Sequence, residues 1–379
     1  MGLPYSKQKW MALTLAAVVM ATGSAAWAAD STAAPSVAPV KQSDQSEELT
    51  LQKAVEQALK TNNDLVTLRI DIDTADINAR LASAKGRDLS ADFVTTLDSA
   101  QAKYVNTATA ETKKKVNQMM LKSVENKVKL GAQKAYYDLL NAQEDLSLKK
   151  QSEQRAELQM KVAKSAFDVG TKAKTDVLQA EAALAAAQAA TSAAESNLEV
   201  ARLNLNQFLG VDLNKQWKLV KTDNQADAKM PDLNEAIARA LEQRPEITQA
   251  EEQIKLSELN VDLIRKYSSI ATYQGQMAEN DVEKAKIDLE QTKRSISIEV
   301  AQAYHNLNSA KTSIDALKKA RDAAAENYRL TNLRFENGLS TTLEVIGAEE
   351  ELSSRENQYQ QAVHNYNLAT VTLQNAIGN

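Results

Sequence analysis

Phe167-Asp168-Val169-Gly170-Thr171 and Phe335-Glu336-Asn337-Gly338-Leu339 are two short stretches, 168 residues apart, that decide the fold of this chain. Each stretch places a glycine between two long runs that are rich in alanine and charged residues. The same offset pairs further identical residues along both runs, namely Ala135 with Ala303, Tyr136 with Tyr304, Leu139 with Leu307, Glu181 with Glu349 and Gly210 with Gly378. The chain is therefore a tandem duplication of a helical hairpin, and the two glycine turns are the hairpin tips.

The composition of the 379 residues favours long helices over a compact globular core. Aromatic residues make up only 4% of the chain, so few large side chains are available to fill the interior of ordinary domains. Alanine, glutamate, lysine and arginine form helices well, and helices packed side by side need few large residues. We therefore expect an all-α fold, or nearly so.

The first 28 residues are typical of a secretory signal peptide. Lys7 and Lys9 precede an apolar run from Trp10 to Met20, and Ala26-Trp27-Ala28 follows as a cleavage site. An uncleaved membrane anchor is the alternative, but the apolar run is shorter than the ~20 residues that a membrane span requires. Residues 29–48 have no apolar periodicity, so we expect a flexible leader. The mature chain is expected to be exported.

The remainder divides into two hairpin repeats, residues 49–210 and 232–379, joined by a linker of residues 211–231. Each repeat begins with a short amphipathic helix, and these two helices lie 182 residues apart, at Leu51 and Leu233. Because the tips are only 168 residues apart, the first repeat contains 14 additional residues between Leu65 and Ala135. We expect a helix break at Lys85–Asp88, a long helix over Val116–Val169 and one short strand around Trp217–Val220.

The segments that precede the two long helices, residues 85–112 and 265–280, lack the pattern of membrane-spanning strands. A spanning β-hairpin requires two strands of ~9–11 residues in which apolar and polar side chains alternate. Neither segment supplies two such strands. We therefore predict that membrane β-strands are short or missing, and the residues give only weak support for membrane contact.

Together, these motifs resemble those of the TolC-like outer membrane efflux proteins. Both short helices follow the pattern L-x-x-A-[VI]-x-x-A-L, and Asn62–Leu65 or Arg244–Ile247 comes directly after them. The stretch FENGLSTTLEV, residues 335–345, is similar to the second hairpin tip of that family. The resemblance covers about residues 49–379, and this chain departs from the family in the reduced or absent strands of its β-barrel.

The resemblance implies a homotrimer in which the helical hairpins form a 12-helix α-barrel. It also implies that a periplasmic adaptor, or membrane fusion protein, docks at the tips and that an inner-membrane pump drives transport. The matching tip positions are Val169, Gly170, Thr171, Gly338, Leu339 and Ser340. In the second repeat of the family, acidic residues just past the tip often constrict the tunnel; Glu344 stands there in this chain, and Asp176 is its counterpart after the first tip. Gly347 replaces a second acidic residue, so a second acidic ring is absent.

Simpler roles remain open for these residues. Gly170 and Gly338 can serve only as tight turns, because glycine adopts a positive φ at little cost. Glu344 completes the pattern of a capping box with Thr341, which would start the return helix whether or not it lines a tunnel. Asp176 can stabilise the N-terminus of its helix through the helix dipole. All three roles are compatible with docking or constriction.

The sequence contains no pattern that predicts catalysis or a cofactor. There is no cysteine, and the only two histidines, His305 and His364, have no carboxylate at ligand spacing, so no metal site is expected. The net charge of -5 gives no support for nucleic-acid binding. The leading hypothesis is an exit duct, or outer membrane factor, of a tripartite efflux or type I secretion system in the outer membrane and periplasm. The alternative is a non-conducting coiled-coil spacer or adaptor of the cell envelope.

Overall fold

The computed structural model describes residues 47–220 and 231–378, which belong to one compact unit of the chain. The expected signal peptide of residues 1–28 lies outside the described residues. The same is true of residues 29–46 of the expected leader and of residues 221–230 of the expected linker.

The described part of the chain is almost entirely helical, as the sequence predicted. The first repeat contains β1 (Glu47–Leu49), α1 (Leu51–Thr61), α2 (Asn63–Asp88), the 3₁₀ turn η1 (Ala91–Phe93), α3 (Leu97–Ala100), the π-helical turn η2 (Gln101–Val105), α4 (Asn106–Asp168) and α5 (Lys174–Phe208). Strand β2 (Trp217–Leu219) follows where the sequence predicted a short strand. The second repeat contains α6 (Leu233–Gln243), α7 (Pro245–Tyr267), α8 (Tyr273–Glu336) and α9 (Thr342–Ile377).

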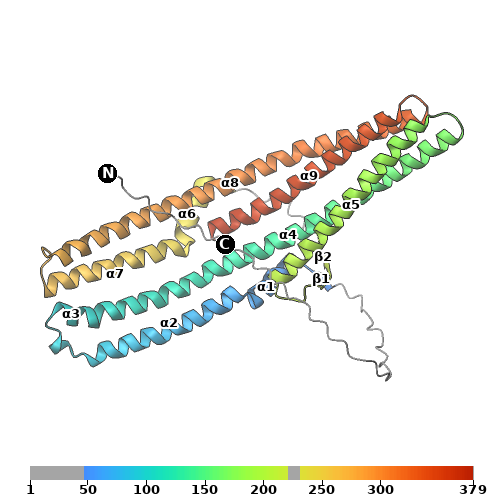
Figure 1. The fold of residues 1–379 in the computed structure, drawn as a ribbon. Helices are drawn as coiled ribbons and strands as arrows, with labels where there is room; N and C mark the ends of the chain where they lie inside the picture. Colours follow the sequence, from blue (N-terminus) through green and yellow to red (C-terminus); the bar gives the residue numbers. More distant parts are fainter. Residues whose placement is uncertain (1–46, 221–230, 379) are drawn as a thin grey trace, which may run out of the picture. The chain divides into compact units, whose positions relative to one another are not determined.

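Two very long helices, α4 and α8, form the shafts of the two repeats. They contain 63 and 64 residues, so each is about 95 Å long at ~1.5 Å per residue. Helix α4 packs against α2 over one half of its length and against α5 over the other (Figure 1). Helix α8 packs in the same way against α7 and α9. Each repeat is therefore two helical hairpins that share one long helix.

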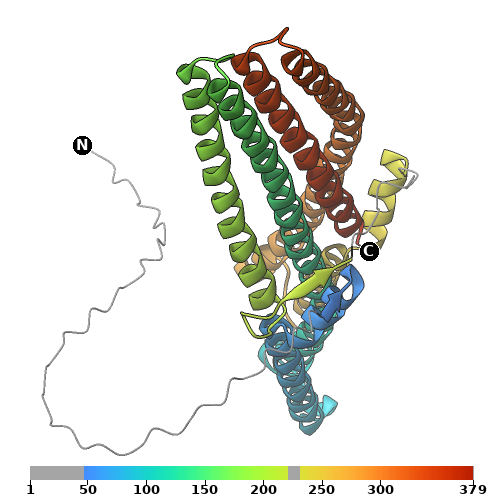
Figure 2. The same cartoon turned by 90° about the vertical axis from the view of Figure 1, so that its right-hand side faces the viewer.

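The two repeats join side by side through α4, which also contacts α9 and α7. Near the tips, the order of neighbouring helices is α5, α4, α9, α8, as Figure 2 shows in its upper part. Towards the other end, the order is α2, α4, α7, α8. Helix α8 thus forms one edge of the helical layer, and α5 or α2 forms the other.

The apolar core is concentrated in two equivalent clusters, where each short helix meets a long helix and the end of a return helix. In the first repeat, Ala54 and Ala58 of α1 are buried against Tyr136 and Leu139 of α4 and Leu205 of α5. In the second repeat, the buried residues include Ala236, Ala240, Ile247, Val300, Ala303, Leu307, Tyr366 and Leu373. Alanine on the short helices lets the helix axes approach closely.

The return helices end in glycines that sit against the short helices. Gly210 and Gly378 have φ angles of 61° and 99°, in the left-handed region that glycine adopts readily. A Cβ atom on Gly210 would lie 3.0 Å from Thr61, and one on Gly378 would lie 3.4 Å from Gln243. Thr61 and Gln243 occupy equivalent positions at the ends of α1 and α6, so both repeats close in the same way.

Strands β1 and β2 form a parallel pair that ties the start of the first repeat to the segment after it. Glu47 pairs with Trp217, and Leu49 pairs with Leu219. The hydroxyl of Tyr136, a fully buried residue of α4, donates a hydrogen bond to the carbonyl of Val220 at 2.6 Å. The strand pair is therefore anchored on the long helix.

The first repeat uses its additional residues at the end opposite the tips. There, α7 and α8 are joined by the short turn 268–272, whereas α2 and α4 are joined by η1, α3 and η2. The predicted break at Lys85–Asp88 is wrong, because α2 continues to Asp88. Gly86 is buried inside the helix, and a Cβ atom there would lie 2.8 Å from the hydroxyl of Thr107 on α4. The glycine permits close helix packing and does not end the helix.

Replacing Tyr136 with alanine should destabilise the protein more than the same change at its repeat counterpart, Tyr304. Tyr136 is fully buried, and its truncation should cost about 3–5 kcal/mol of unfolding free energy. Tyr304 is only partly buried, so its truncation should cost roughly half as much or less. Urea unfolding followed by circular dichroism measures both. Equal losses would contradict the assignment of Tyr136 as the anchor of the first cluster.

Candidate functional site

The first hairpin tip is a tight turn that ends α4 with a left-handed glycine. Gly170 has a φ of 76°, and its N–H donates to the carbonyl of Phe167 at 2.9 Å. The N–H of Thr171 donates to the carbonyl of Ala166 at 2.9 Å, and its hydroxyl donates to the same oxygen at 2.8 Å. This pair of backbone bonds is the Schellman motif, which satisfies the last carbonyls of a helix.

The second tip repeats the same turn at the end of α8. Gly338 has a φ of 74° and donates to the carbonyl of Phe335 at 2.9 Å, while Leu339 donates to the carbonyl of Arg334 at 2.8 Å. A Cβ atom on Gly170 or Gly338 would meet nothing within 4 Å. The turns therefore require glycine for its backbone conformation and not for lack of space.

Both tips expose large apolar side chains to solvent. Val169 and Leu339, which flank the two glycines, are 74% and 70% exposed. Leu343, in the first turn of α9, is also largely exposed. The two tips are neighbours, since the Lys172 ammonium lies 4.8 Å from the centre of the Phe335 ring across them. The structure thus brings the predicted tip residues of both repeats together at one end of the layer.

The two acidic residues past the tips cap their own helices. The Asp176 carboxylate accepts a hydrogen bond from the N–H of Ala173 at 3.0 Å. The Glu344 carboxylate accepts one from the N–H of Thr341 at 2.8 Å, and the Thr341 hydroxyl accepts one from the N–H of Glu344 at 3.2 Å. The capping box read from the sequence is therefore present. Ser340 also donates to Glu344, and these hydrogen bonds hold the pKa of its carboxyl below the ordinary value of 4.5.

An ionic cluster further along the shafts joins the two repeats, and sequence reasoning missed it. The Arg155 guanidinium of α4 contacts the Glu349 carboxylate at 3.1 Å and the Glu356 carboxylate at 3.0 Å, both on α9. Ser152 donates to Glu349 at 2.7 Å, and the ring centre of Tyr328 lies 5.9 Å from Arg155. Glu349 and Glu356 are seven residues apart on one helix face, which was the only signal available from the sequence.

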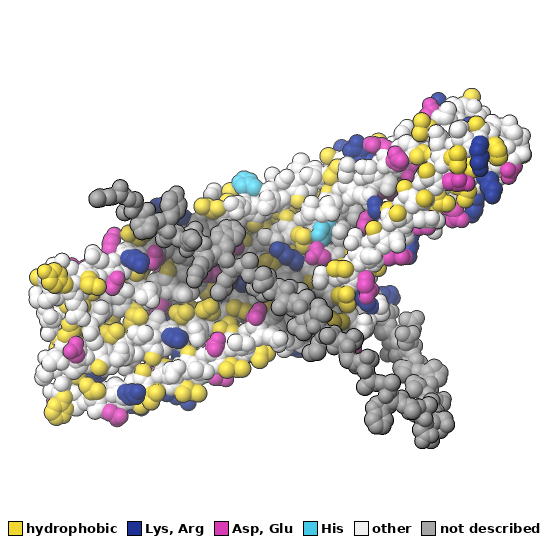
Figure 3. All heavy atoms as spheres, in the orientation of Figure 1, with side chains coloured by type: hydrophobic (Ala, Val, Ile, Leu, Met, Phe, Trp, Pro, Cys, Tyr) yellow, Lys and Arg dark blue, Asp and Glu magenta, His cyan; other side chains and the backbone are white. Residues whose placement is uncertain are grey.

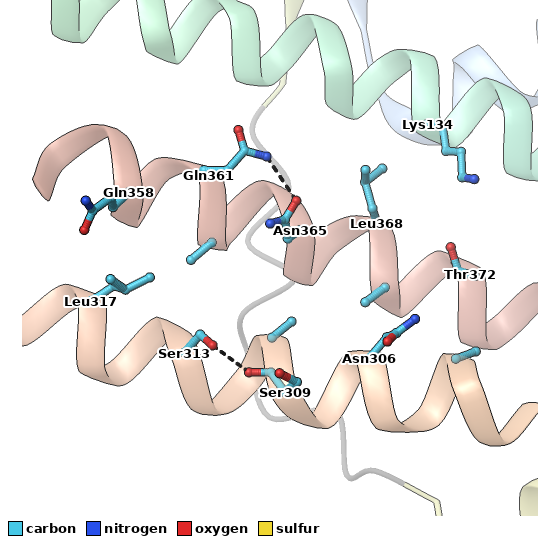
Figure 4. Close-up of a pocket in the computed structure, with 14 residues that line it drawn as sticks. Lys134, Asn306, Ser309, Ser313, Leu317, Gln358, Gln361, Asn365, Leu368 and Thr372 are labelled. Atoms are coloured by element: carbon cyan, nitrogen blue, oxygen red, sulfur yellow. Dashed lines mark hydrogen bonds between the residues drawn. The ribbon is translucent and has the colours of Figure 1, made fainter. Parts of the chain in front are cut away.

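A long open groove of roughly 690 Å³ runs between α8 and α9 (Figure 4). Ser309 and Ser313 line it from α8, and Gln361 and Asn365 line it from α9. The Gln361 amide donates to Asn365 at 3.0 Å, so these polar groups bond along their own helix. Besides apolar side chains, the lining offers amides, hydroxyls and the Lys134 ammonium, and it contains no Asp, Glu, His or Cys side chain.

Within residues 47–220 and 231–378, no cluster of three or more His, Cys, Asp or Glu side chains is placed to hold a metal ion. In the same ranges, every helix is too short or too polar to cross a membrane. His364 lies 3.2 Å from Asp138 between α9 and α4.

Comparison with known proteins gives one family match. The sequence matches the family model described as outer membrane efflux protein over residues 88–211 and 274–379. The two matched ranges contain both tips and most of both long hairpins. The search of curated proteins found no match.

Several solved structures share the fold. The outer-membrane channel OprN is 18% identical, with a TM-score of 0.75, and the match covers 86% of this chain and 89% of that one. The CmeC outer membrane channel of Campylobacter jejuni is 15% identical, with a TM-score of 0.73 and coverage of 86% and 85%. The outer membrane protein VceC of Vibrio cholerae is 14% identical, with a TM-score of 0.73 and coverage of 87% and 96%. The predicted fold class is confirmed.

Proposed function

Because the chain belongs to the outer membrane efflux protein family, we propose that three copies of it form a helical exit duct of a tripartite efflux or type I secretion system. The family and its structural neighbours are channels of the outer membrane and not enzymes, so the chain is an efflux protein of the cell envelope. The alternative of a non-conducting spacer has no support among these matches. Cargo would move passively through the duct, driven by an inner-membrane partner.

The trimer is proposed because both edges of the helical layer expose large apolar side chains. Helix α2 packs against α4, and α8 packs against α7 and α9, so both helices lie at an edge of the layer. Their other sides expose large apolar side chains, which are Val66, Ile70, Ile77 and Leu81 on α2 and Ile287, Ile298, Leu330 and Leu333 on α8. Two hairpin repeats are too few to close a tunnel. A ring of three copies would bury both edges and enclose a channel.

The role of the two edge helices in the trimer can be tested by replacing one apolar residue on α2 or α8 with glutamate. Ile77→Glu or Ile287→Glu should shift the protein from trimer to monomer, since each would place a charge in an apolar contact between copies. Leu213→Glu is the matched control, because Leu213 is also half exposed but follows α5 and lies on neither α2 nor α8. Light scattering in detergent measures the mass. A wild-type protein that is strictly monomeric in detergent and in buffer, or that carries no current in lipid bilayers, would rule out the duct.

We further propose that the tips are the docking surface for a periplasmic adaptor. The support is the exposure of Val169 and Leu339 beside two identical Schellman turns. Exposed apolar side chains on a rigid turn are typical of a surface that a partner protein covers, because binding removes their apolar area from water. Thr171 and Ser340, which follow in the two tips, would add hydrogen-bonding groups around this apolar contact.

Gly338→Val should weaken binding of the adaptor from the same organism at least about tenfold, because valine disfavours the positive φ of that turn. Gly347→Ala is the control, since a Cβ atom there meets nothing within 4 Å inside the regular helix α9. Helix content by circular dichroism should be unchanged in both variants. Binding is measured by surface plasmon resonance, and unaltered affinity of the Gly338→Val protein would reject the docking role.

We propose, last, that Glu344 and Asp176 place negative charge in a constriction of the tunnel near the tips. The capping bonds of Glu344 are compatible with this role, because they favour the ionised form of its carboxyl. The lowered pKa keeps the Glu344 carboxyl ionised down to pH values below 4.5. Three copies would then present a ring of Glu344 charges that attracts divalent cations.

Magnesium ions should block the wild-type current at neutral pH, and the block should persist as the pH falls to 4.5. It should disappear below that pH, when the Glu344 carboxyl takes up a proton. The Glu344→Gln channel should show little block at any pH. Single-channel recording measures the block at each pH. An equal block of both proteins at neutral pH would show that Glu344 does not line the constriction.

A further inference from the structure

One edge of the helical layer, formed by α2 and α5, contains an open polar groove. The groove has a volume of roughly 550 Å³ and lies where α1 passes into α2, beside the end of α5. We call it the edge groove, and its lining consists of Thr61, Asn62, Asn63, Asp64, Asn204, Gln207, Phe208 and Gly210. Amides supply most of its polar groups, and Asp64 supplies one carboxylate.

In the second repeat, the equivalent site is occupied by α4. The repeat counterparts of Asp64, Gln207 and Gly210 are Glu246, Asn375 and Gly378. The Asn126 amide of α4 donates a hydrogen bond to the carbonyl of Gly378 at 3.3 Å, and the Asn375 amide donates one to the carbonyl of Asn126 at 2.9 Å. Ser123 of α4 also donates to the Glu246 carboxylate at 3.3 Å. These contacts hold α4 against the start of α7 and the end of α9.

The edge groove is exposed where its counterpart is covered. Gly210 is exposed at the end of α5, whereas Gly378 is buried at the end of α9. Asn126, which binds in the covered site, is 7% exposed. Its repeat counterpart is Arg294 on α8, and this side chain is exposed. The chain therefore has an open copy of the site at one edge of the layer and the matching residue on the helix that forms the other edge.

The two long helices are turned in the same way at this level. Val128 and Ala132 of α4 are buried in the first apolar cluster, and their counterparts Ile296 and Val300 of α8 are buried in the second. Because the same positions face inward, Arg294 lies on the side of α8 that corresponds to the side of α4 that contacts α9. Charged side chains lie along α8 among the apolar ones, as the upper edge of Figure 3 shows. Helix α8 thus presents polar groups as well as apolar residues at its edge.

We propose that Arg294 of one copy binds in the edge groove of the next copy. Its guanidinium would donate to the carbonyl of Gly210 and pair with the carboxylate of Asp64, since it carries five N–H donors in a planar fork. Gln291, the counterpart of Ser123, lies one turn before Arg294 and would reach the same carboxylate. The inference rests on the proposed function for the ring of copies, and it adds the contact that fixes how far one copy is shifted along the next.

This contact between copies differs in charge from the contact within the chain. Asn126 is neutral, whereas Arg294 and Asp64 attract each other as ions, and salt screens exposed ions. The mass of the protein in detergent should therefore shift toward the monomer as salt is raised. The Arg294→Asn protein, which carries the residue of the within-chain contact, should keep its trimers and lose most of this salt dependence. A wild type without salt dependence, or an Arg294→Asn protein with the same dependence, would contradict the ionic contact.

Charge reversal tests the pairing of Arg294 with Asp64. Arg294→Glu should raise the protein concentration needed for trimers at least about tenfold, because two carboxylates would face each other. Adding Asp64→Arg to the same chain should recover most of that loss, because it restores opposite charges. Lys311→Glu is the matched control, since it makes the same change of charge on α8 about 25 Å closer to the tips, and it should behave like the wild type. Sedimentation in detergent measures all four proteins, and no recovery in the double variant, or an equal loss in the control, would overturn the proposal.

Cross-linking tests the position of the contact directly, because the chain contains no cysteine of its own. The Asp64→Cys/Arg294→Cys protein should form covalent dimers and trimers with a short bismaleimide, which a denaturing gel shows. The Asp64→Cys/Arg321→Cys control should not, since Arg321 lies about 40 Å further along α8. Trimers that are not cross-linked through residues 64 and 294 would reject this contact and leave the duct standing. A wild-type protein that is monomeric would reject the duct as well.

Discussion

The structure depends on one constraint, which is that a helix about 95 Å long must find partners along its whole length. Helix α4 meets this constraint because α1, α2, α5, α7 and α9 all pack against it. Small side chains make it possible, because buried Ala132, Ala156 and Ala163 let adjacent helices approach α4 closely. With so few large side chains, stability must come from many modest contacts spread along the shafts, with two denser clusters where the short helices cross.

Polar contacts also join the two repeats, through α4 and α9. Near the middle of the shafts, the Asn126 side-chain amide donates a hydrogen bond to the carbonyl of Gly378, and the Asn375 side-chain amide donates one to the carbonyl of Asn126. Closer to the tips, the Arg155 guanidinium of α4 forms salt bridges with the Glu349 and Glu356 carboxylates of α9. A guanidinium that is largely withdrawn from water requires such partners, so these groups fix the register of α4 against α9 as well as holding the helices together.

Much of this arrangement could be predicted, because short sequence patterns decide the turns and caps and many of these patterns occur in both repeats. The glycines at 170 and 338, the capping box of Thr341 and Glu344 and the strand near Trp217 each follow from a few adjacent residues, and each is present in the structure. Gly86 misled the prediction, because a glycine that allows close packing with Thr107 looks the same in sequence as one that ends a helix. The cluster around Arg155 could not be foreseen, because its partners are more than 190 residues away.

The residues present only in the first repeat make the two halves of the molecule different. Two identical hairpins arising by duplication could pair within a chain or between chains equally well, because nothing would distinguish their surfaces. The segment from η1 to η2 breaks that equivalence, since it reaches across to α7 at Leu263 and Asn260. A strap present on only one half gives the pair a fixed order and disfavours exchange of halves between copies. The segment from η1 to η2 thus makes the two halves of the chain structurally distinct at the end opposite the tips.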